Sequence, residues 1–551
     1  MLPRRRLARI FAALQPVLGA AFPSLAQGPD ASDEIIYQFM PIAWRASEAR
    51  CKAAAAGSDA PETKYRFGDF AGMTESLDYL RSLGVTAVWM TPVFPSAAYH
   101  GYQHGPADTL NPWFGTEKDF TDFVRAAHAR KIKVFIDIVV YGISRSSAYY
   151  TSAHNNPASP YASWLAFTDD AKSKSQGYDF QTWNGATLGI TFWDLRRPEP
   201  RDLVIAWSKK WLDLNGDGDF SDGVDGYRLD HVWAKYPNGP DGWGYHIDTF
   251  WKPWKQALRA VNPRVFTFAE QARWETTGAD LLPAHDAAFT KPFEHAAREA
   301  LKTGKAAPLY EAMRTTVDAI PLTRSYGNSF LAILGDHDVD RLASAIGADD
   351  DHAGRARAAA AVLLLQPFPP IIYMGDELGM RGTAGDFKCD ANDIPRREPF
   401  KWTAVAGPPM SNYSAIHDGA YAARFSRDND GRSVEEQAGK PGSLLETYRE
   451  LIALRDAHAA LRRGEYVPLP STHPGVWAFA RTHENETLIV AINLADDPAS
   501  TTLNLAPARA TGPVRDLTGT GARPPIAPTT RAAYPLELAA HAWSVLRITA
   551  E

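Results

Sequence analysis

Two residues of opposite charge stand two positions apart at the end of an apolar run. Arg228 and Asp230 end the run 224–230, and alternate positions of an extended strand point to the same side. A buried arginine keeps a neighbouring carboxylate ionised, because an unpaired buried charge is costly. A fixed, ionised aspartate is what a nucleophile requires. The pair therefore predicts a nucleophilic Asp230, although a structural ion pair explains these two residues equally well.

A glutamate ends the next strong apolar run along the chain. Glu270 ends the run 265–270, and apolar neighbours raise the pKa of a carboxyl group. A carboxyl group that stays protonated can act as a general acid. Because Glu270 follows Asp230 by one predicted strand, the two residues together predict a pair of carboxyl groups with different roles.

A dense group of polar residues follows the run 329–334. It contains Asp336, His337, Asp338 and Asp340. Aspartate accepts and histidine donates hydrogen bonds, so the group suits a clamp for sugar hydroxyls. A metal-dependent hydrolase that uses these four residues is the alternative interpretation.

The elements that would position these residues form a repeating pattern. Apolar runs without alternation are typical of parallel strands buried on both faces, and helical patterns lie between them. The pattern predicts an α/β fold, a (β/α)₈ TIM barrel whose active site lies at the carboxyl ends of the strands. A doubly wound open sheet is the alternative. The eight runs are 35–40, 85–91, 132–140, 224–230, 265–270, 287–289, 329–334 and 370–374.

Two regions depart from this pattern, and they set the predicted domain boundaries. Residues 141–195, rich in Ser, Asn, Pro, Tyr and Trp, predict an irregular subdomain inserted after strand 3. Residues 465–551 contain short alternating runs separated by turn residues, which predict a C-terminal antiparallel β-sandwich. The catalytic barrel is then expected over 34–140 and 196–464, with a helix over 444–461 closing it.

The first residues are typical of a secretory signal peptide. Arg4, Arg5 and Arg6 precede an apolar run over 10–22, and Ser24-Leu25-Ala26 provides a small-x-small cleavage site. We expect residues 1–26 to be removed and the protein to be periplasmic or secreted, with no membrane contact after cleavage. An uncleaved anchor is the alternative, although the run is shorter than the roughly 20 apolar residues of a membrane span.

Composition narrows the function classes further. The 551 residues are 45% hydrophobic and 22% charged, as in ordinary globular proteins. A formal net charge of −6 lacks the basic footprint of a nucleic-acid-binding protein. We expect no nucleic acid partner and no organic cofactor, and the oligomeric state is not readable from the sequence.

The two cysteines, Cys51 and Cys389, follow the first and eighth predicted strands, so a disulfide and two free thiols are both compatible with a closed barrel.

In their order along the chain, these motifs resemble glycoside hydrolase family 13, the α-amylase family. The resemblance covers roughly residue 34 to the end of the chain. It is carried by Gly226-Tyr227-Arg228-Leu229-Asp230, by Glu270 and by His337-Asp338. Further similar segments are 112–116, 373–380 and 397–402.

The resemblance implies a role for each of these residues. Asp230 matches the nucleophile, Glu270 the general acid/base and Asp338 the third acid, which stabilises the transition state. It also implies that Arg228, His337 and Asp137 are substrate-side residues and that Tyr102 stacks on a sugar ring. A retaining mechanism predicts carboxyl groups of Asp230 and Glu270 about 5–5.5 Å apart.

The implied activity is hydrolysis of α-glucosidic bonds in starch-like glucans or maltooligosaccharides through a covalent glycosyl-enzyme intermediate. A transglycosylase or glucosyl-isomerising enzyme with the same site is the alternative, and a non-catalytic carbohydrate-binding relative would lack one of the acids. The expected partner is therefore an oligo- or polysaccharide.

The third run departs from the family pattern. Asp137 is kept, but Tyr141 and Gly142 stand where the family has an Asn-His pair that serves calcium and the sugar. His104, in the loop after Tyr102, is a candidate for supplying an imidazole to the substrate instead.

A separate segment predicts a structural calcium site. Asp213, Asn215, Asp217, Asp219 and Asp222 place oxygen ligands along a short loop, with Gly218 at the turn. The spacing resembles the start of an EF-hand loop, although the later bidentate Glu is missing. A solvated acidic turn is the alternative, but so many like charges favour a bridging cation.

Overall fold

The fold is described from a computed structural model of the chain. The described residues are 29–349, 353–508, 511–519, 522–527 and 531–548. The predicted signal segment 1–26 lies outside them. Within the described ranges, no helix combines the length and the apolar character that crossing a membrane requires.

The core of the described chain is a parallel sheet of eight strands in the order β10-β9-β8-β7-β3-β2-β1-β11. A parallel bridge between Ala332 and Pro370 joins the two outer strands and closes the barrel. This confirms the predicted (β/α)₈ architecture. The strands are β1 Ile36–Phe39, β2 Ala87–Met90, β3 Lys133–Ile138, β7 Gly226–Val232, β8 Phe266–Gln271, β9 Ala287–Phe289, β10 Phe330–Leu331 and β11 Ile371–Tyr373.

Helices surround the barrel and cover its apolar strands. In α6 (Glu117–Ala129), Phe120, Phe123, Val124 and Ala127 form the buried face, and Thr116 with Asp119 forms the capping box that starts the helix. The other helices that follow barrel strands or close the barrel are α5 Leu77–Leu83, α8 Pro198–Lys210, α9 Lys252–Val261, α10 Lys291–Thr303, α11 Ala307–Asp318, α13 Ala353–Leu365 and α15 Leu444–Ala457. Shorter ones are α2 Glu48–Ala55, α3 Pro61–Lys64, α4 Phe70–Glu75, α12 Leu342–Ala345, α14 Val434–Gln437 and α16 Ala459–Arg463.

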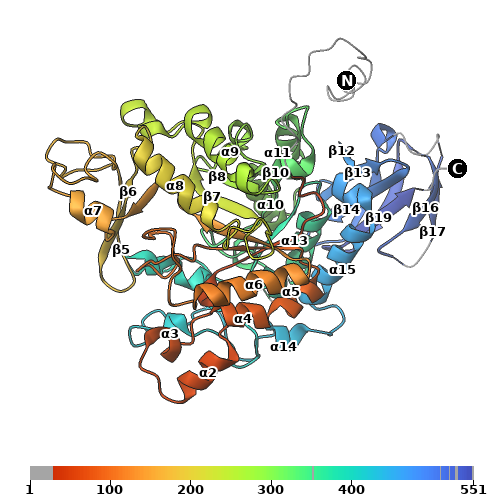
Figure 1. Ribbon diagram of the computed structural model, residues 1–551. Helices are drawn as coiled ribbons and strands as arrows, with labels where there is room; N and C mark the ends of the chain where they lie inside the picture. Colours follow the sequence, from red (N-terminus) through yellow and green to blue (C-terminus); the bar gives the residue numbers. More distant parts are fainter. Residues whose placement is uncertain (1–28, 350–352, 509–510, 520–521, 528–530, 549–551) are drawn as a thin grey trace, which may run out of the picture.

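The segment inserted after β3 is more regular than its composition predicted. It contains α7 (Ala148–Ala153) and an antiparallel sheet of β4 (Gly142–Ser144), β6 (Thr187–Phe192) and β5 (Gly177–Gln181), in that order. Figure 1 shows this segment projecting from one side of the barrel, away from the C-terminal sheets. A Cβ on Gly142 would lie 2.3 Å from Ile190 Cγ2, so the close approach of β6 requires glycine there.

Beyond the barrel, the chain folds into antiparallel sheets, as predicted. One has the order β12-β13-β14-β19-β16-β17, and β15 pairs with β18 in a second. Residues such as Ala478, Ile489, Leu536 and Leu546 form a separate apolar core between them. The strands are β12 Glu465–Pro468, β13 Val476–His483, β14 Glu486–Asn493, β15 Ala499–Leu503, β16 Gly512–Asp516, β17 Ala522–Ile526, β18 Tyr534–Leu538 and β19 Trp543–Ile548.

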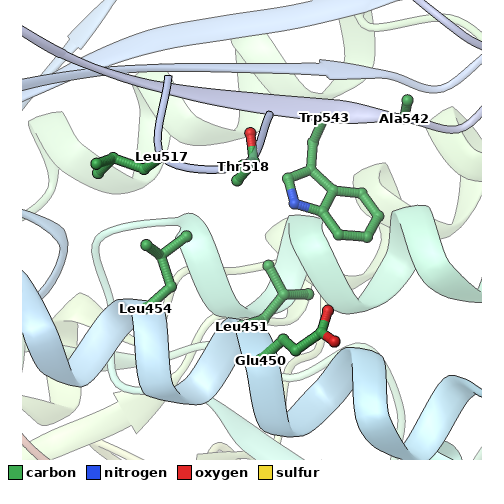
Figure 2. Close-up of a pocket in the computed structure, with 7 residues that line it drawn as sticks. All are labelled: Glu450, Leu451, Leu454, Leu517, Thr518, Ala542 and Trp543. Carbon is green, nitrogen blue, oxygen red and sulfur yellow. The ribbon is translucent and has the colours of Figure 1, made fainter. Parts of the chain in front are cut away.

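Helix α15 connects the barrel to these C-terminal sheets. Figure 2 shows a cavity of about 490 Å³ at this junction, where Leu451 and Leu454 of α15 face Leu517 and Trp543 across the gap. The predicted helix over 444–461 is divided at His458 into α15 and α16.

The two cysteines are free, so the disulfide interpretation is wrong. Each lies in the region predicted for it, but each thiol packs against its own neighbour. Cys51 Sγ, on α2, lies 3.9 Å from the carbonyl oxygen of Ala46, whereas Cys389 Sγ lies 4.0 Å from the hydroxyl of Tyr421.

Candidate active site

A cavity of about 420 Å³ opens at the carboxyl ends of the barrel strands. We call it the strand-end cavity. Asp230, Asp338 and Tyr102 line it from the barrel, and Tyr178 of the inserted segment lines it from the hairpin β5–β6. The cavity therefore lies between the barrel and the inserted segment, at the strand ends where the sequence predicted the catalytic acids.

Arg228 brings three carboxyl groups together behind this cavity. Its Nη1 lies 2.7 Å from Asp230 Oδ1 and 3.0 Å from Asp137 Oδ2, and its Nη2 lies 2.6 Å from Glu270 Oε2. The Arg228 side chain is fully buried, so these charged contacts are shielded from water. Residues from three neighbouring strands, β3, β7 and β8, are thus held by a single guanidinium.

Asp230 is held in its ionised form. Arg228 donates to Oδ1, and the hydroxyl of Tyr141 donates to Oδ2 at 3.0 Å. Burial by itself would raise the pKa of Asp230, but the nearby charges of His231 and Arg228 outweigh burial and lower it. Asp230 therefore has the charge and the fixed geometry of a nucleophile.

The pKa of Glu270 shifts in the direction opposite to that of Asp230. Burial raises the pKa of its carboxyl group, against the opposing charges of Arg228 and His231. Its Oε2 accepts from Arg228 at 2.6 Å and from the backbone N–H of His231 at 3.4 Å, whereas Oε1 accepts from the Trp274 indole at 3.1 Å. Two neighbouring carboxyl groups with separated pKa values are the pattern of an acid and a nucleophile.

Asp338 reaches the same cavity from the loop after β10. Arg397 Nη2 lies 2.9 Å from its Oδ1, and His337 Nε2 lies 3.2 Å from its Oδ2. Burial opposes ionisation of Asp338, but His337 and Arg397 lower its pKa well below the ordinary range. With 29% of its side chain exposed, Asp338 is free to accept hydrogen bonds from a ligand.

The metal-site interpretation of the Asp336 region lacks support from the charges around it. Possible ligand atoms of Asp336, His337 and Asp338 do lie within 4.8 Å of one another. However, Lys291 Nζ contacts Asp336 Oδ2 at 2.8 Å, and Arg397 contacts Asp338. The protein's own cations thus already compensate these two carboxylates.

Tyr102 is the predicted substrate residue that lines the cavity. Its ring stacks on the His337 ring at a centroid distance of 5.1 Å, and its hydroxyl donates to Asp137 Oδ2 at 2.8 Å. Arg228, His337 and Asp137 lie behind this layer and are fully buried. The structure therefore places these three as supports of the cavity-lining Tyr102, Asp230 and Asp338, and Arg228 also holds the buried Glu270. Burial raises the pKa of Asp137 to about 8.

His104 is not placed to bind a substrate. Its Nδ1 donates to the carbonyl of Gly105 at 2.7 Å, which leaves Nε2 to accept the Val139 N–H at 3.2 Å. Burial lowers the pKa of His104 to about 4, so the ring is neutral. Both ring nitrogens serve the backbone, and the prediction of an imidazole for the substrate is not supported.

The acidic loop 213–222 precedes β7 and lies at the opposite end of that strand from Asp230. Its carboxylates accept hydrogen bonds from the loop backbone; the half-buried Asp213, for example, accepts from the N–H groups of Gly216 and Gly218. The loop's acids do not form a cluster as compact as that of Asp336, His337 and Asp338. Asp222 differs from the others, because it is buried and its Oδ1 has no hydrogen-bond partner.

Sequence reasoning missed several residues that complete the site. Tyr141 was noted as a departure from a pattern, and its hydroxyl now contacts Asp230. Trp274 and His231 follow the two acids closely in sequence and line the cavity. Their proximity to Glu270 and Asp230 was the available signal. For Arg397, the family resemblance of 397–402 was the only signal, and its contact with Asp338 depends on a long loop after β11.

Comparisons with known proteins agree with this geometry. A family model of the α-amylase catalytic domain matches residues 46–464, and a model of the maltogenic amylase C-terminal domain matches 467–545. Alpha-amylase 3 of Dictyoglomus thermophilum is 26% identical over 438 residues, covering 78% of this chain and 81% of its own length. Trehalose synthase of Pimelobacter is 26% identical over 546 residues, covering 88% and 92%. The crystal structure of α-amylase from H. orenii has a TM-score of 0.74 at 25% identity, covering 93% and 99%.

Proposed function

The chain belongs to the α-amylase family of glycoside hydrolases, and on that basis we propose that it hydrolyses α-glucosidic bonds in starch-like glucans or maltooligosaccharides with retention of configuration. One observation carries the assignment of roles: Arg228 holds Asp230 and Glu270 on its two amino groups. The two acids are thus fixed beside each other, which a double displacement requires.

The first step uses the opposite protonation of the two acids. An oxygen of Asp230 forms a bond to the anomeric carbon of the sugar. The bond from that carbon to the leaving oxygen breaks, and the leaving oxygen keeps the electron pair and takes a proton from Glu270. Glu270 Oε2 accepts from the charged Arg228 and from the His231 N–H, whereas Oε1 accepts from the neutral Trp274 indole, so we assign the transferred proton to Oε1.

The second step reverses the roles. A water molecule gives a proton to Glu270 while its oxygen bonds to the anomeric carbon. The bond to Asp230 breaks, and its electron pair returns to the carboxylate. Asp338, which reaches the cavity in ionised form, holds sugar hydroxyls during both steps.

A product profile tests this proposal. The enzyme is incubated with soluble starch, maltotriose, sucrose and trehalose, and the sugars released or transferred are analysed. We expect maltooligosaccharides or glucose from the α-glucans, and a loss of at least about 10⁴-fold in kcat for Asp230→Asn. Conversion of one disaccharide into another would support the transfer alternative, which the similarity to a trehalose synthase favours. Cleavage of glucans by Asp230→Asn at the parental rate would refute the proposed site.

We also propose that the loop 213–222 holds a structural calcium ion. Its carboxylate and amide oxygens are the donors that calcium prefers. The buried Oδ1 of Asp222 has no partner within the protein and would gain one. Asp213, Asn215, Asp217, Asp219 and Asp222 would hold the ion, which would brace the approach to β7. If neither EDTA nor added calcium changed the melting temperature, this site would be ruled out.

Finally, we propose that the protein is exported to the periplasm or secreted. The basic start, the apolar run and the small-x-small site within residues 1–26 support export. N-terminal sequencing of the protein from its producing cells should begin near Gln27, and an intact Met1 in the exported protein would exclude cleavage.

A further inference from the structure

Tyr141 occupies the junction between the barrel and the inserted segment. It follows β3 and directly precedes β4, and it is 3% exposed. Its carbonyl accepts from the Trp193 N–H at 3.1 Å and from the Tyr245 hydroxyl. The Tyr141 backbone is therefore fixed from the side of the inserted segment.

The Tyr141 ring is fixed as firmly as its backbone. It stacks on His231 at a centroid distance of 5.9 Å, and Phe192 and Trp233 pack against it edge-on at 5.2 and 5.6 Å. The hydroxyl consequently has one direction, and it points to Asp230 Oδ2 at 3.0 Å. The other oxygen of Asp230 is bound by Arg228 at 2.7 Å.

The Tyr141 hydroxyl is a donor under all working conditions. Burial, and then the charge of Asp230, raise its pKa well above the ordinary value for tyrosine, so it keeps its proton. When Asp230 is ionised, its carboxylate has no proton to donate, so it is the acceptor of this hydrogen bond. The other titratable or charged groups that face this pair are Arg228 and His231 of β7, Asp137 of β3, Glu270 of β8, Asp338 after β10, Tyr178 of β5, and Tyr102 and His104 of the loop after β2.

We propose that Tyr141 is a positioning residue that sets the rate at which the covalent glycosyl-enzyme intermediate is released. The inference rests on the proposed retaining mechanism. During release, the bond between the anomeric carbon and Asp230 breaks and negative charge returns to the carboxylate. A hydroxyl already aimed at Oδ2 stabilises that charge as it develops, which speeds the step.

The same hydrogen bond has the opposite influence on attack. It stabilises the free carboxylate before the first step, so its loss leaves a more basic Asp230 that attacks no more slowly. The two steps should therefore respond differently to loss of the hydroxyl. A role confined to packing would instead slow both steps together.

The test is Tyr141→Phe, which keeps the ring and removes only the hydroxyl. Rapid-quench kinetics with 4-nitrophenyl α-glucoside give separate rate constants for formation and release of the glycosyl-enzyme. We expect release to slow about 10- to 100-fold, as for loss of a hydrogen bond to a charged group, and formation not to slow. Intact-mass spectrometry of the quenched variant should show enzyme one glucosyl unit heavier.

A pH profile gives a second readout. Loss of a donor destabilises the ionised form of Asp230, so its pKa should rise. The acid limb of kcat/KM should then move to higher pH in Tyr141→Phe. An unmoved acid limb, together with an unchanged release constant, would overturn the proposal.

Tyr245→Phe is the matched control, because it also removes a buried hydroxyl from this aromatic cluster. The Tyr245 hydroxyl contacts the Tyr141 carbonyl but not Asp230. This variant should lower the melting temperature without slowing release. Equal slowing of formation and release in Tyr141→Phe, or slowing of release in Tyr245→Phe by the same factor, would also overturn the proposal. A parent enzyme that forms no covalent intermediate would contradict the retaining mechanism itself, and the positioning role with it.

Discussion

Two groups of acids in this molecule share their residue types and differ in almost everything else. The strand-end group consists of Asp137, Asp230, Glu270 and Asp338, and Arg228 and Arg397 hold it from the buried side. The loop group, over 213–222, accepts hydrogen bonds from its own backbone, and its Asp217 and Asp219 are exposed. Asp230, Glu270 and Asp338 were predicted because each ends or follows an apolar run, whereas the loop was predicted from its local excess of carboxylates.

The comparison shows that burial and cations, rather than carboxylate number, decide what an acidic group can do. In the strand-end group, low exposure makes each charge contact strong enough to separate the pKa values of Asp230 and Glu270. In the loop, water and backbone amides satisfy the exposed charges of Asp217 and Asp219 at little cost. The buried Asp222 is the exception, because its Oδ1 lacks a partner.

The largest contrast between the two groups is expected for an acid-to-amide change. Glu270→Gln should lower kcat/KM on maltooligosaccharides by about 10²–10⁴-fold, because a glucosyl leaving group needs a proton in the first step, which kcat/KM reports. The loss should be much smaller with 4-nitrophenyl α-glucoside, whose leaving group is weakly basic. Steady-state kinetics with both substrates measure the difference.

Asp217→Asn in the loop is the control for this change. It should leave kcat at the parental value and act on the melting temperature only when calcium is present. Equal losses with the two substrates in Glu270→Gln would contradict its role as the acid. A large fall in kcat for Asp217→Asn would break the distinction between the two groups.

The free energy of unfolding should distinguish the strand-end group from the loop group almost as clearly as kinetics does. Arg228→Leu leaves several buried carboxylates without their shared cation and should cost about 3–5 kcal/mol of unfolding free energy. Asp219→Asn, measured in EDTA, should change it by no more than about 0.5 kcal/mol, as for an exposed site. Urea denaturation of both variants measures the two changes in unfolding free energy. Equal costs would mean that Arg228 does not compensate the strand-end acids.

The smallest effect concerns a single neutral donor within the strand-end group. Trp274 donates to Glu270 Oε1, which stabilises the ionised form of that carboxyl group. Trp274→Phe should therefore raise the pKa of Glu270 and move the alkaline limb of kcat/KM to higher pH by a fraction of a unit. Movement of this limb to lower pH would show that Trp274 does not act through the ionised carboxylate.

The barrel was predictable because its signal is local. Continuous apolar runs such as 224–230 and 265–270 must be buried on both faces, and their order along the chain places their polar ends at one rim. Asp230, Glu270 and Asp338 could be chosen for the same reason, since each ends or follows such a run. The capping box at Thr116 and the buried face of α6 were also fixed by neighbouring residues.

The contacts that sequence reasoning missed depend on how the loops after the strands direct their side chains. His104 was chosen as an imidazole near Tyr102, but its ring nitrogens meet Gly105 and Val139 in the folded chain. The free thiols of Cys51 and Cys389 show the same limit, because neighbouring strands do not dictate where the following loops direct their side chains. Tyr141 meets Asp230 across 89 positions, which no periodicity reveals.

The anomeric configuration of the first product tests the central claim most directly. Proton NMR of the sugar released from a maltooligosaccharide, recorded before mutarotation, distinguishes the α from the β form. An account with Asp230 as nucleophile and Glu270 as acid and base predicts the α-anomer, because two inversions restore the original configuration. Initial release of the β-anomer would contradict it, since a single displacement by water would leave Asp230 without a covalent role.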